Sequence, residues 1–332
     1  MSPQKAGIGR ITAAVVAMAA MLPYLTLKIF WLTGHPVGVS DPAFMNDPAM
    51  VGLNVMTFGM DAVALLLALA FTTRQGMRLP AWLVLPPLWV GTGLLSVVIV
   101  TVPIGVLVSG PSIFVTGGPI APWVYMMVYG GFIGQGVGLI VAFALYARDR
   151  WPAVFSTALG YGYASPTRSF QTVVARGALP VSAVLGATRL YWAAGNPAPE
   201  QVPQDGFKGL LTLGAGIALV LLVRGRGSRA FWPPLVVGWL GTGVMFGWGL
   251  YAMILTVTGG PLGARMTGAV GLVELFGTLT GLVMAMCGAF LLAERSGAGA
   301  GRSGVGHVQP AQDALEGEDR EGDRETADQG HR

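Results

Sequence analysis

Hydrophobic residues fall into eight long stretches that short polar segments separate. The stretches cover residues 11–33, 48–72, 81–109, 121–147, 178–195, 206–223, 231–258 and 267–293. A helix needs about 20 apolar residues to cross the hydrocarbon core of a bilayer, and the stretches are near this length. They are continuous rather than alternating, which disfavours a transmembrane β-barrel. The pattern predicts an all-α integral membrane protein with eight transmembrane helices.

The two ends of the chain differ in character. The first stretch follows Lys5 and Arg10, so a cleaved signal peptide is one explanation of it. We expect a retained helix instead, because the stretch continues to Leu32 and ends like an internal helix. Residues 294–332 are rich in glycine and charged residues and contain no aromatic residue. We expect them to form a disordered cytoplasmic tail, because they cannot bury enough apolar surface to fold.

Basic residues gather in alternate loops. Of the 20 Lys and Arg residues, all but Lys28, Arg189, Lys208 and Arg265 lie in the N-terminal segment, in the tail, or in the loops after the second, fourth and sixth stretches. Cytoplasmic loops of membrane proteins carry an excess of Lys and Arg. The distribution predicts a multi-pass protein of the cell membrane with both termini in the cytoplasm. It assigns Lys208 and Arg265 to outer loops.

A pattern from the first half of the chain recurs in the second half. Lys28-x-x-Trp31-x-x-Gly34-x-Pro36 matches Arg189-x-x-Trp192-x-x-Gly195-x-Pro197. Matches at a spacing of 150 residues join Arg74, Trp82, Trp89 and Gly91-Thr92-Gly93 to Arg224, Trp232, Trp239 and Gly241-Thr242-Gly243. The alignment predicts an internal duplication, with residues 1–147 as the first four-helix repeat, 148–177 as a cytoplasmic linker and 178–293 as the second repeat.

Each predicted repeat has four spans, so both repeats face the same way in the membrane. We therefore expect parallel repeats that a pseudo-two-fold axis along the membrane normal relates. The first helices of the repeats end in Phe30-Trp31-Leu32-Thr33-Gly34 and Tyr191-Trp192-Ala193-Ala194-Gly195. These endings resemble a family of bacterial four-helix membrane proteins with a similar Tyr-Trp-Ala-x-Gly sequence. The resemblance implies a fused tandem pair of that unit and brings no established activity.

Four ionisable residues lie inside the predicted helices. Lys28 and Arg189 occupy matching positions near the outer ends of their helices. They either snorkel to the headgroups as anchors or point inward and line a cavity. Asp61 and Glu274 lie in apolar stretches, where an ionised carboxylate needs a partner. We expect the pairs Lys28–Asp61 and Arg189–Glu274.

Small residues and Asp-Pro pairs predict local structure. Asp41 and Asp47 each precede Pro-Ala, which is typical of a helix start; weak cation binding is the alternative. Glycine stripes let helices pack closely. The stripes contain Gly130, Gly134, Gly138 and Ala142 on the fourth helix, Gly243 and Gly247 on the seventh, and Gly277 and Gly281 on the eighth. A homo-oligomer or a membrane partner on these faces is the alternative. We expect residues 148–176, which mix aromatic residues with arginines, to lie on an anionic leaflet.

Composition narrows the classes of function. The chain is 53% hydrophobic and 11% charged, with a mean hydropathy of +0.62, which indicates a lipid bilayer as its environment. Its basic pI of about 9.4 comes from arginines in short loops, which does not indicate nucleic-acid binding. The single Cys287 and the three scattered histidines predict no disulfide, metal centre or haem. Phosphate-binding loops and Gly-x-Ser-x-Gly are missing, so we expect no cofactor and favour a non-enzymatic role.

Two functions fit these features. The first is small-molecule binding or a permease-like role through an outward-facing cavity between the repeats. Its candidate residues are Lys28, Asp61, Arg189, Glu274, Trp31 and Trp192. The alternative is a non-catalytic membrane subunit or scaffold in which the charges form structural ion pairs. A third candidate is an enzyme acting on lipid, with Asp61 or Glu274 as acid or base, but no further polar cluster supports it.

Overall fold

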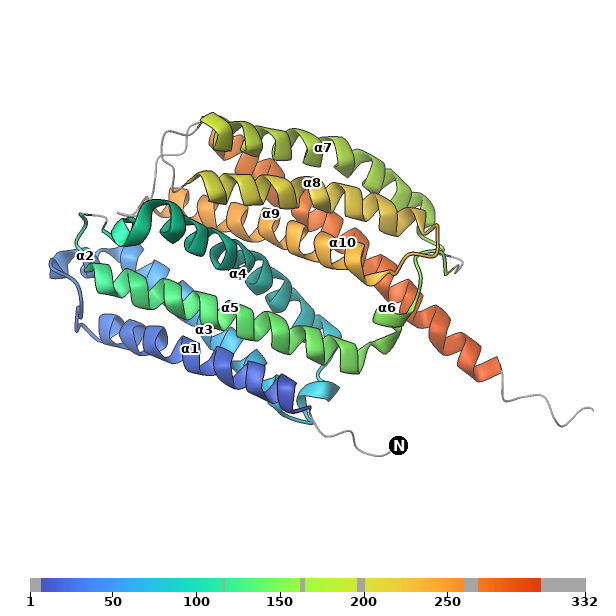
Figure 1. The fold of residues 1–332 in the computed structure, drawn as a ribbon, viewed down its shortest axis with the longest axis horizontal. Coiled ribbons are helices and arrows are strands. Elements are labelled where there is room, and N and C mark those ends of the chain that lie inside the picture. Colours follow the sequence, from blue (N-terminus) through green and yellow to red (C-terminus); the bar gives the residue numbers. More distant parts are fainter. Residues whose placement is uncertain (1–6, 116, 162–164, 196–200, 260–267, 306–332) are drawn as a thin grey trace, which may run out of the picture.

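The computed structural model describes residues 7–115, 117–161, 165–195, 201–259 and 268–305. Its long helices lie side by side (Figure 1). They are α1 (Ile8–Leu32), α3 (Pro48–Thr72), α4 (Ala81–Ser109), α5 (Pro122–Arg150), α7 (Arg168–Gly195), α8 (Val202–Arg224), α9 (Trp232–Thr258) and α10 (Gly268–Val305). Short elements between them are α2 (Pro42–Asn46), η1 (Gly76–Arg78), η2 (Gly110–Phe114) and α6 (Pro152–Ser156). Among the described residues, eight helices are long and apolar enough to cross a membrane, which confirms a multi-pass membrane protein.

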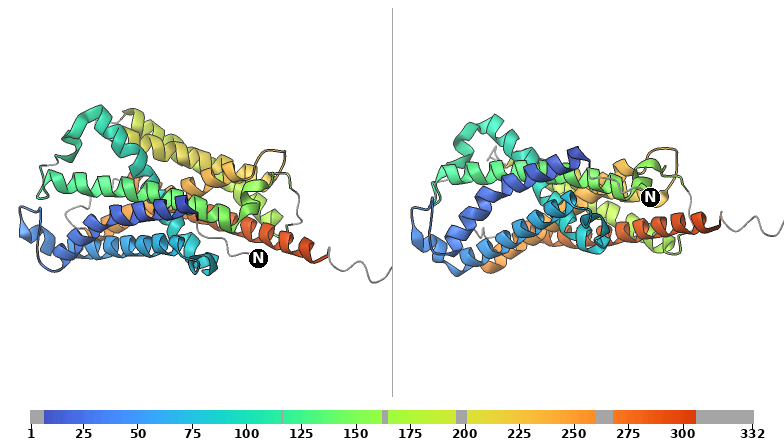
Figure 2. Two further views of the ribbon diagram at one scale, coloured as in Figure 1. Left: turned by 60° about the horizontal axis from the view of Figure 1, so that its bottom comes forward. Right: turned by 90° about the horizontal axis from the view of Figure 1, so that it is seen from below.

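Two helices are longer than the apolar pattern predicts. α7 begins at Arg168 rather than at 178, and α10 continues to Val305 rather than ending at 293. Both extensions lie at the end of the bundle where α1 begins, and α10 projects past the other helices there (Figure 2). Polar residues can continue a helix beyond the hydrocarbon core, so hydrophobicity marks the apolar part of a helix and not its end. Residues 306–332 of the predicted tail lie outside the described residues.

Side chains and glycine close the helix ends as the sequence predicts. Asp41 accepts a hydrogen bond from the Ala43 amide at 2.9 Å, and Asp47 accepts one from the Ala49 amide at 2.9 Å. Both carboxylates therefore cap helix starts, at α2 and α3. Gly34 follows the end of α1 with a φ of +86°, a left-handed conformation that glycine adopts without steric cost. The chain thus leaves the helix direction of α1 at Gly34.

The helices form two groups of four. In the first group, α1, α3, α4 and α5 enclose one apolar core, which contains Met21, Phe71 and Leu139. In the second group, α7, α8, α9 and α10 enclose another core around Leu185 and Met284. The groups meet along α4 and α9, which lie between the outer helices (Figure 1). We call the end of the bundle where α1 begins the proximal end, and the end that carries α2 and η2 the distal end.

Close helix contacts use the predicted glycine stripes. A Cβ added at Gly138 of α5 would lie 2.8 Å from the Ala13 carbonyl oxygen of α1, and one at Gly134 would lie 2.9 Å from the Cβ of Ala20. On α10, a Cβ at Gly281 would lie 2.9 Å from the Thr242 carbonyl oxygen. These glycines therefore pack helices of the same chain against one another, as small residues do in membranes.

Two reciprocal hydrogen bonds join the groups where α4 crosses α9. The indole nitrogen of Trp89 donates to the Thr242 hydroxyl at 3.0 Å, and that of Trp239 donates to the Thr92 hydroxyl at 2.9 Å. Gly93 lies at the same crossing, where a Cβ would come 2.6 Å from the Gly243 carbonyl oxygen. We call this contact between α4 and α9 the seam. It is filled by indole rings and closely approaching backbone.

The start of α7 is tied to α10 at the proximal end. The Glu294 carboxylate accepts hydrogen bonds from the Ser165 hydroxyl at 2.5 Å, from the Thr167 hydroxyl at 2.6 Å and from the Gln171 amide at 3.1 Å. A carboxylate at the first turn of a helix compensates the free amides and the positive end of the helix dipole. Glu294 thus stabilises the extension of α7 that the apolar pattern does not predict.

Candidate functional site

Lys28 and Arg189 both point into the protein. Only 1% of the Lys28 surface and 7% of the Arg189 surface are exposed, although each residue lies on a helix that faces lipid along part of its surface. Of the two alternatives for these cations, their burial favours the inward direction over snorkelling to the headgroups. The groups around each cation account for its inward direction, because a buried cation is retained only where polar groups or rings replace its hydration.

Lys28 is held by α3 and by its own helix. Its ammonium group donates to the Asn54 side-chain oxygen at 3.2 Å and to the Thr57 hydroxyl, and it lies 4.5 Å from the centre of the Tyr24 ring. The expected ion pair with Asp61 is not formed among the described residues. Asn54 and Thr57 lie closer than Asp61 to the distal end of α3, and the Lys28 ammonium group contacts these two side chains instead of Asp61. We call Tyr24, Lys28, Asn54, Thr57, Asp61 and Gln135 the first polar cluster.

Asp61 is buried in the same cluster with one oxygen unpaired. Its side chain is 6% exposed, and its Oδ1 accepts a hydrogen bond from the Gln135 amide of α5 at 3.2 Å. Its Oδ2 is buried and has no hydrogen-bond partner in the part of the chain that the structure describes. A buried unsatisfied oxygen costs about 1–3 kcal/mol, and more when it is charged, so this atom needs a function or a further partner.

Arg189 forms the ion pair with Glu274 that the sequence predicts. The guanidinium lies 2.9 Å from the Glu274 carboxylate of α10, and it also lies 3.5 Å from the Asp205 carboxylate of α8. The apolar pattern does not indicate Asp205, because the sixth apolar stretch begins at residue 206. Val202 begins α8 instead, which places Asp205 in the first turn beside α7. Asp205 itself was a signal for this helix start, because acidic residues are common in the first turn of a helix.

Lys208 lies inside the bundle and not in an outer loop, which corrects the prediction. It is 6% exposed, and its ammonium group lies 4.1 Å from the centre of the Trp248 ring of α9. The Trp248 ring makes an edge contact with Tyr251 at 6.1 Å. Its indole nitrogen is buried without a hydrogen-bond partner. We call Arg189, Asp205, Lys208, Trp248 and Glu274 the second polar cluster.

The two tryptophans of the repeated motif differ in their surroundings. Trp31 donates from its indole nitrogen to the Val37 carbonyl oxygen at 2.9 Å and packs against the small core around Met50. It therefore closes the distal loop. Trp192 is half-buried on α7. The structure thus brings Arg189 and Glu274 into contact. Lys28 and Asp61 share one four-helix group and lie within electrostatic range of each other, but they do not form an ion pair in the described part of the chain.

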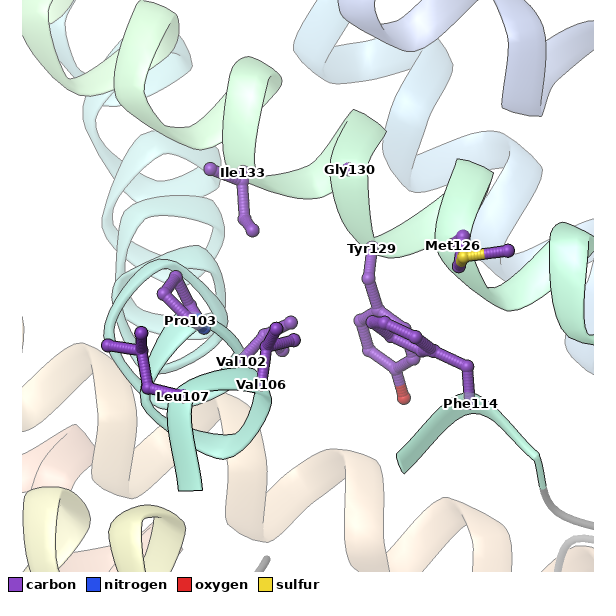
Figure 3. Close-up of a pocket in the computed structure, with 9 residues that line it drawn as sticks. All are labelled: Val102, Pro103, Val106, Leu107, Phe114, Met126, Tyr129, Gly130 and Ile133. Carbon is purple, nitrogen blue, oxygen red and sulfur yellow. The ribbon is translucent and has the colours of Figure 1, made fainter. Parts of the chain in front are cut away.

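An apolar pocket of about 420 Å³ opens between α4, η2 and α5 in the distal half of the bundle (Figure 3). Pro103 and Leu107 line it from α4, and Tyr129 and Gly130 line it from α5. Phe114 of η2 also lines the pocket, and its ring lies tilted against the Tyr129 ring with the centroids 5.9 Å apart. None of the six predicted site residues lines this pocket, and the seam between the groups is packed.

No group of three or more His, Cys, Asp or Glu residues in the described part of the chain could hold a metal ion. Comparison with protein-family models, with curated proteins and with solved structures finds no match for this chain. The geometry of the two polar clusters is therefore the basis for a functional proposal.

Proposed function

We propose that this membrane protein consists of two parallel four-helix repeats that a pseudo-two-fold axis along the membrane normal relates. The reciprocal bonds at the seam support this arrangement, because Trp89 and Thr92 correspond to Trp239 and Thr242 in the alignment of the two halves. A two-fold axis brings the same surface patch of each repeat into contact, so each hydrogen bond occurs twice with the roles of the two repeats exchanged. Helices α4 and α9 are the third long helices of their groups, as such an axis requires.

We further propose that the protein binds a small molecule at its distal end, in a permease-like role. The observation that carries this proposal is that Lys28 and Lys208 are buried in the distal half, and neither forms an ion pair among the described residues. Each ammonium group faces an aromatic ring instead. Carboxylates lie within electrostatic range, Asp61 of Lys28 and Asp205 and Glu274 of Lys208, but none of them contacts an ammonium group. Charged residues buried in a membrane protein are costly, and they commonly mark solute or ion sites. A ligand with an anionic or hydrogen-bond-accepting group would complete both sites.

We propose that the ligand binds at the clusters within the repeats rather than at the seam. Indole rings and glycine backbone fill the seam. Tyr251 of α9 makes an edge contact with Trp248 of the second cluster at 6.1 Å. We place the distal end outside the cell, because basic residues gather in the proximal loops.

Thiol labelling tests whether water and solutes reach the first cluster. In a Cys287→Ala background, a cysteine at Thr57 should react with a membrane-impermeant reagent, because the Thr57 hydroxyl contacts Lys28. The matched control is Val55→Cys, two residues away on α3, where the side chain is 54% exposed on the outer face of the helix. That cysteine should react only with a lipid-soluble reagent. Small anions and zwitterions that bind should slow the reaction at Thr57→Cys.

A non-catalytic scaffold is the second candidate, and the second polar cluster favours it. Arg189 is paired with both Asp205 and Glu274, which leaves its guanidinium well compensated inside the protein. If the cysteine at Thr57 stays unreactive in folded protein, the binding proposal fails. The charges would then act as structural pairs that fix the relative positions of α7, α8 and α10.

A further inference from the structure

We propose that Asp61 is a proton-binding site, which takes up and releases a proton while the Lys28 ammonium group moves between two positions. The inference deepens the proposed function, on which it rests, by naming the ion that the distal site exchanges. It starts from the unpaired Oδ2 atom of Asp61, which is buried and has no hydrogen-bond partner.

The surroundings of Asp61 hold a neutral carboxyl group better than a carboxylate. Within the described residues, the one hydrogen bond to Asp61 comes from the Gln135 amide, and it reaches only Oδ1. An ionised carboxylate inside a membrane requires a cation or several donors, whereas a protonated carboxyl group carries no net charge. With a proton on Oδ2, the bond from Gln135 is kept and the charge is removed.

The helices packed against α3 offer one cation in the distal half. α1 contributes Lys28 and the phenol of Tyr24, and its other basic residue, Arg10, pairs at the proximal end with Asp149 of α5. α4 and α9 have no charged residue. The Ser96 hydroxyl of α4 is used by the Gly93 carbonyl oxygen at 2.8 Å. The remaining titratable groups on these helices near the cluster are the phenols of Tyr129 and Tyr251.

Lys28 is placed to respond to the charge of Asp61. Thr57, which accepts from the ammonium group, and Asp61 are four residues apart on one face of α3, which is about 6 Å along the helix. When the proton leaves, the carboxylate attracts the ammonium group away from Asn54 and Thr57. The ammonium group is then neutralised by Asp61 and attracts an anionic or hydrogen-bond-accepting ligand less strongly. Proton release and ligand release would therefore be coupled through one lysine.

A proton fits this position better than a metal ion. Hard metal ions take about six oxygen ligands. Asp61 Oδ2 has no polar partner, and the nearby Asn54 and Thr57 oxygens are occupied by Lys28. A proton requires only one lone pair of the carboxylate.

Dicyclohexylcarbodiimide, an apolar reagent for protonated carboxyl groups, tests the proposal in membranes that contain the full chain. The carboxyl oxygen bonds to the central carbon of the reagent while the carboxyl proton moves to one of its nitrogens, and acyl transfer to nitrogen then gives a stable adduct with no leaving group. We expect mass spectrometry to find this adduct on Asp61 at neutral pH and to find less as the pH rises. Glu274, which pairs with Arg189 at 2.9 Å, is the internal control and should remain unlabelled. Labelling of Glu274 without Asp61 would overturn the proposal.

Infrared difference spectra decide the outcome if the reagent does not reach Asp61. The wild-type protein should show the carbonyl band of a protonated carboxyl group, and the band should disappear in Asp61→Asn and at alkaline pH. Spectra of the two proteins that do not differ would overturn the proposal. Movement of Lys28 is read from Thr57→Cys, whose labelling should rise with pH more steeply than in the same variant carrying Asp61→Asn. A negative infrared result would refute the proton site, but it would not change the labelling of Thr57→Cys that the binding proposal predicts. Failure of the proton site and failure of the binding proposal are therefore distinguishable.

Discussion

Gly93 of α4 and Gly243 of α9 lie backbone against backbone at the seam. A Cβ on Gly243 would come 2.6 Å from the Trp89 carbonyl oxygen, which is too close for any real contact. The absence of side chains at both positions allows the helices to approach until Trp89 and Trp239 reach the threonines on the opposite helix. Close approach and hydrogen bonding are thus parts of one contact.

Gly93→Val should separate α4 from α9. Overpacking costs about 1–3 kcal/mol, so the free energy of unfolding in mixed micelles should fall by about this amount. Gly91→Val is the control on the same helix, because nothing lies within 4 Å of a Cβ at Gly91. Equal effects of the two substitutions would show that the seam does not depend on the small size of Gly93.

Thr92→Val and Thr242→Val should destabilise the protein by similar amounts. Each substitution keeps the shape of the side chain and removes the acceptor of one indole N–H group, which costs about 1–3 kcal/mol per unsatisfied donor. Thr256→Val is the control, because the Thr256 hydroxyl is exposed and bonds only within its own helix. A loss at one site alone would contradict the two-fold relation that we propose for the seam.

The apolar pattern predicts the number of spans because crossing a bilayer imposes a length and a composition on each helix. It cannot predict which side of a helix faces the protein, so it leaves the direction of Lys28 open. Charge alone suggests the pair Lys28–Asp61, whereas in the structure Asn54 and Thr57 accept from the lysine. The predicted pair Arg189–Glu274 is confirmed.

Arg189→Met should cost more stability than Glu274→Gln. Loss of the arginine leaves two carboxylates facing each other in the bundle, and breaking a buried ion pair costs about 3–5 kcal/mol. Glu274→Gln leaves Asp205 as a partner of Arg189, so a smaller loss is expected. Unfolding of both variants and of the double variant gives the coupling energy. If the glutamine variant were the less stable one, Asp205 would not share the charge of Arg189.

Asp61→Asn should leave the free energy of unfolding within about 0.5 kcal/mol of wild type, or raise it, because the asparagine oxygen still accepts from Gln135 and no charge is buried. Asp61→Leu is the comparison, and it should lose about 1–3 kcal/mol because Gln135 is then left without its acceptor. Both are measured by the same unfolding assay. A strongly destabilised asparagine variant would show that the carboxylate itself is needed for folding.

The orientation that we propose can be read from two exposed serines. Ser40 lies in the distal loop before α2, and Ser156 lies in α6 at the proximal end. In intact cells that carry Cys287→Ala, an impermeant thiol reagent should label Ser40→Cys and should not label Ser156→Cys. Permeabilised cells should give labelling of both. The reverse pattern in intact cells would place the distal end in the cytoplasm.

The tie between Glu294 and the start of α7 has a consequence for biosynthesis. Ser165 and Thr167 lie more than 120 residues before the carboxylate that caps them. While the ribosome is still producing α8 and α9, the first turn of α7 has no such partner and remains open to solvent. The second helix group therefore reaches its final state only when α10 has been inserted. A chain truncated before Glu294 should lack the cap at the start of α7, although all of α7 has been synthesised.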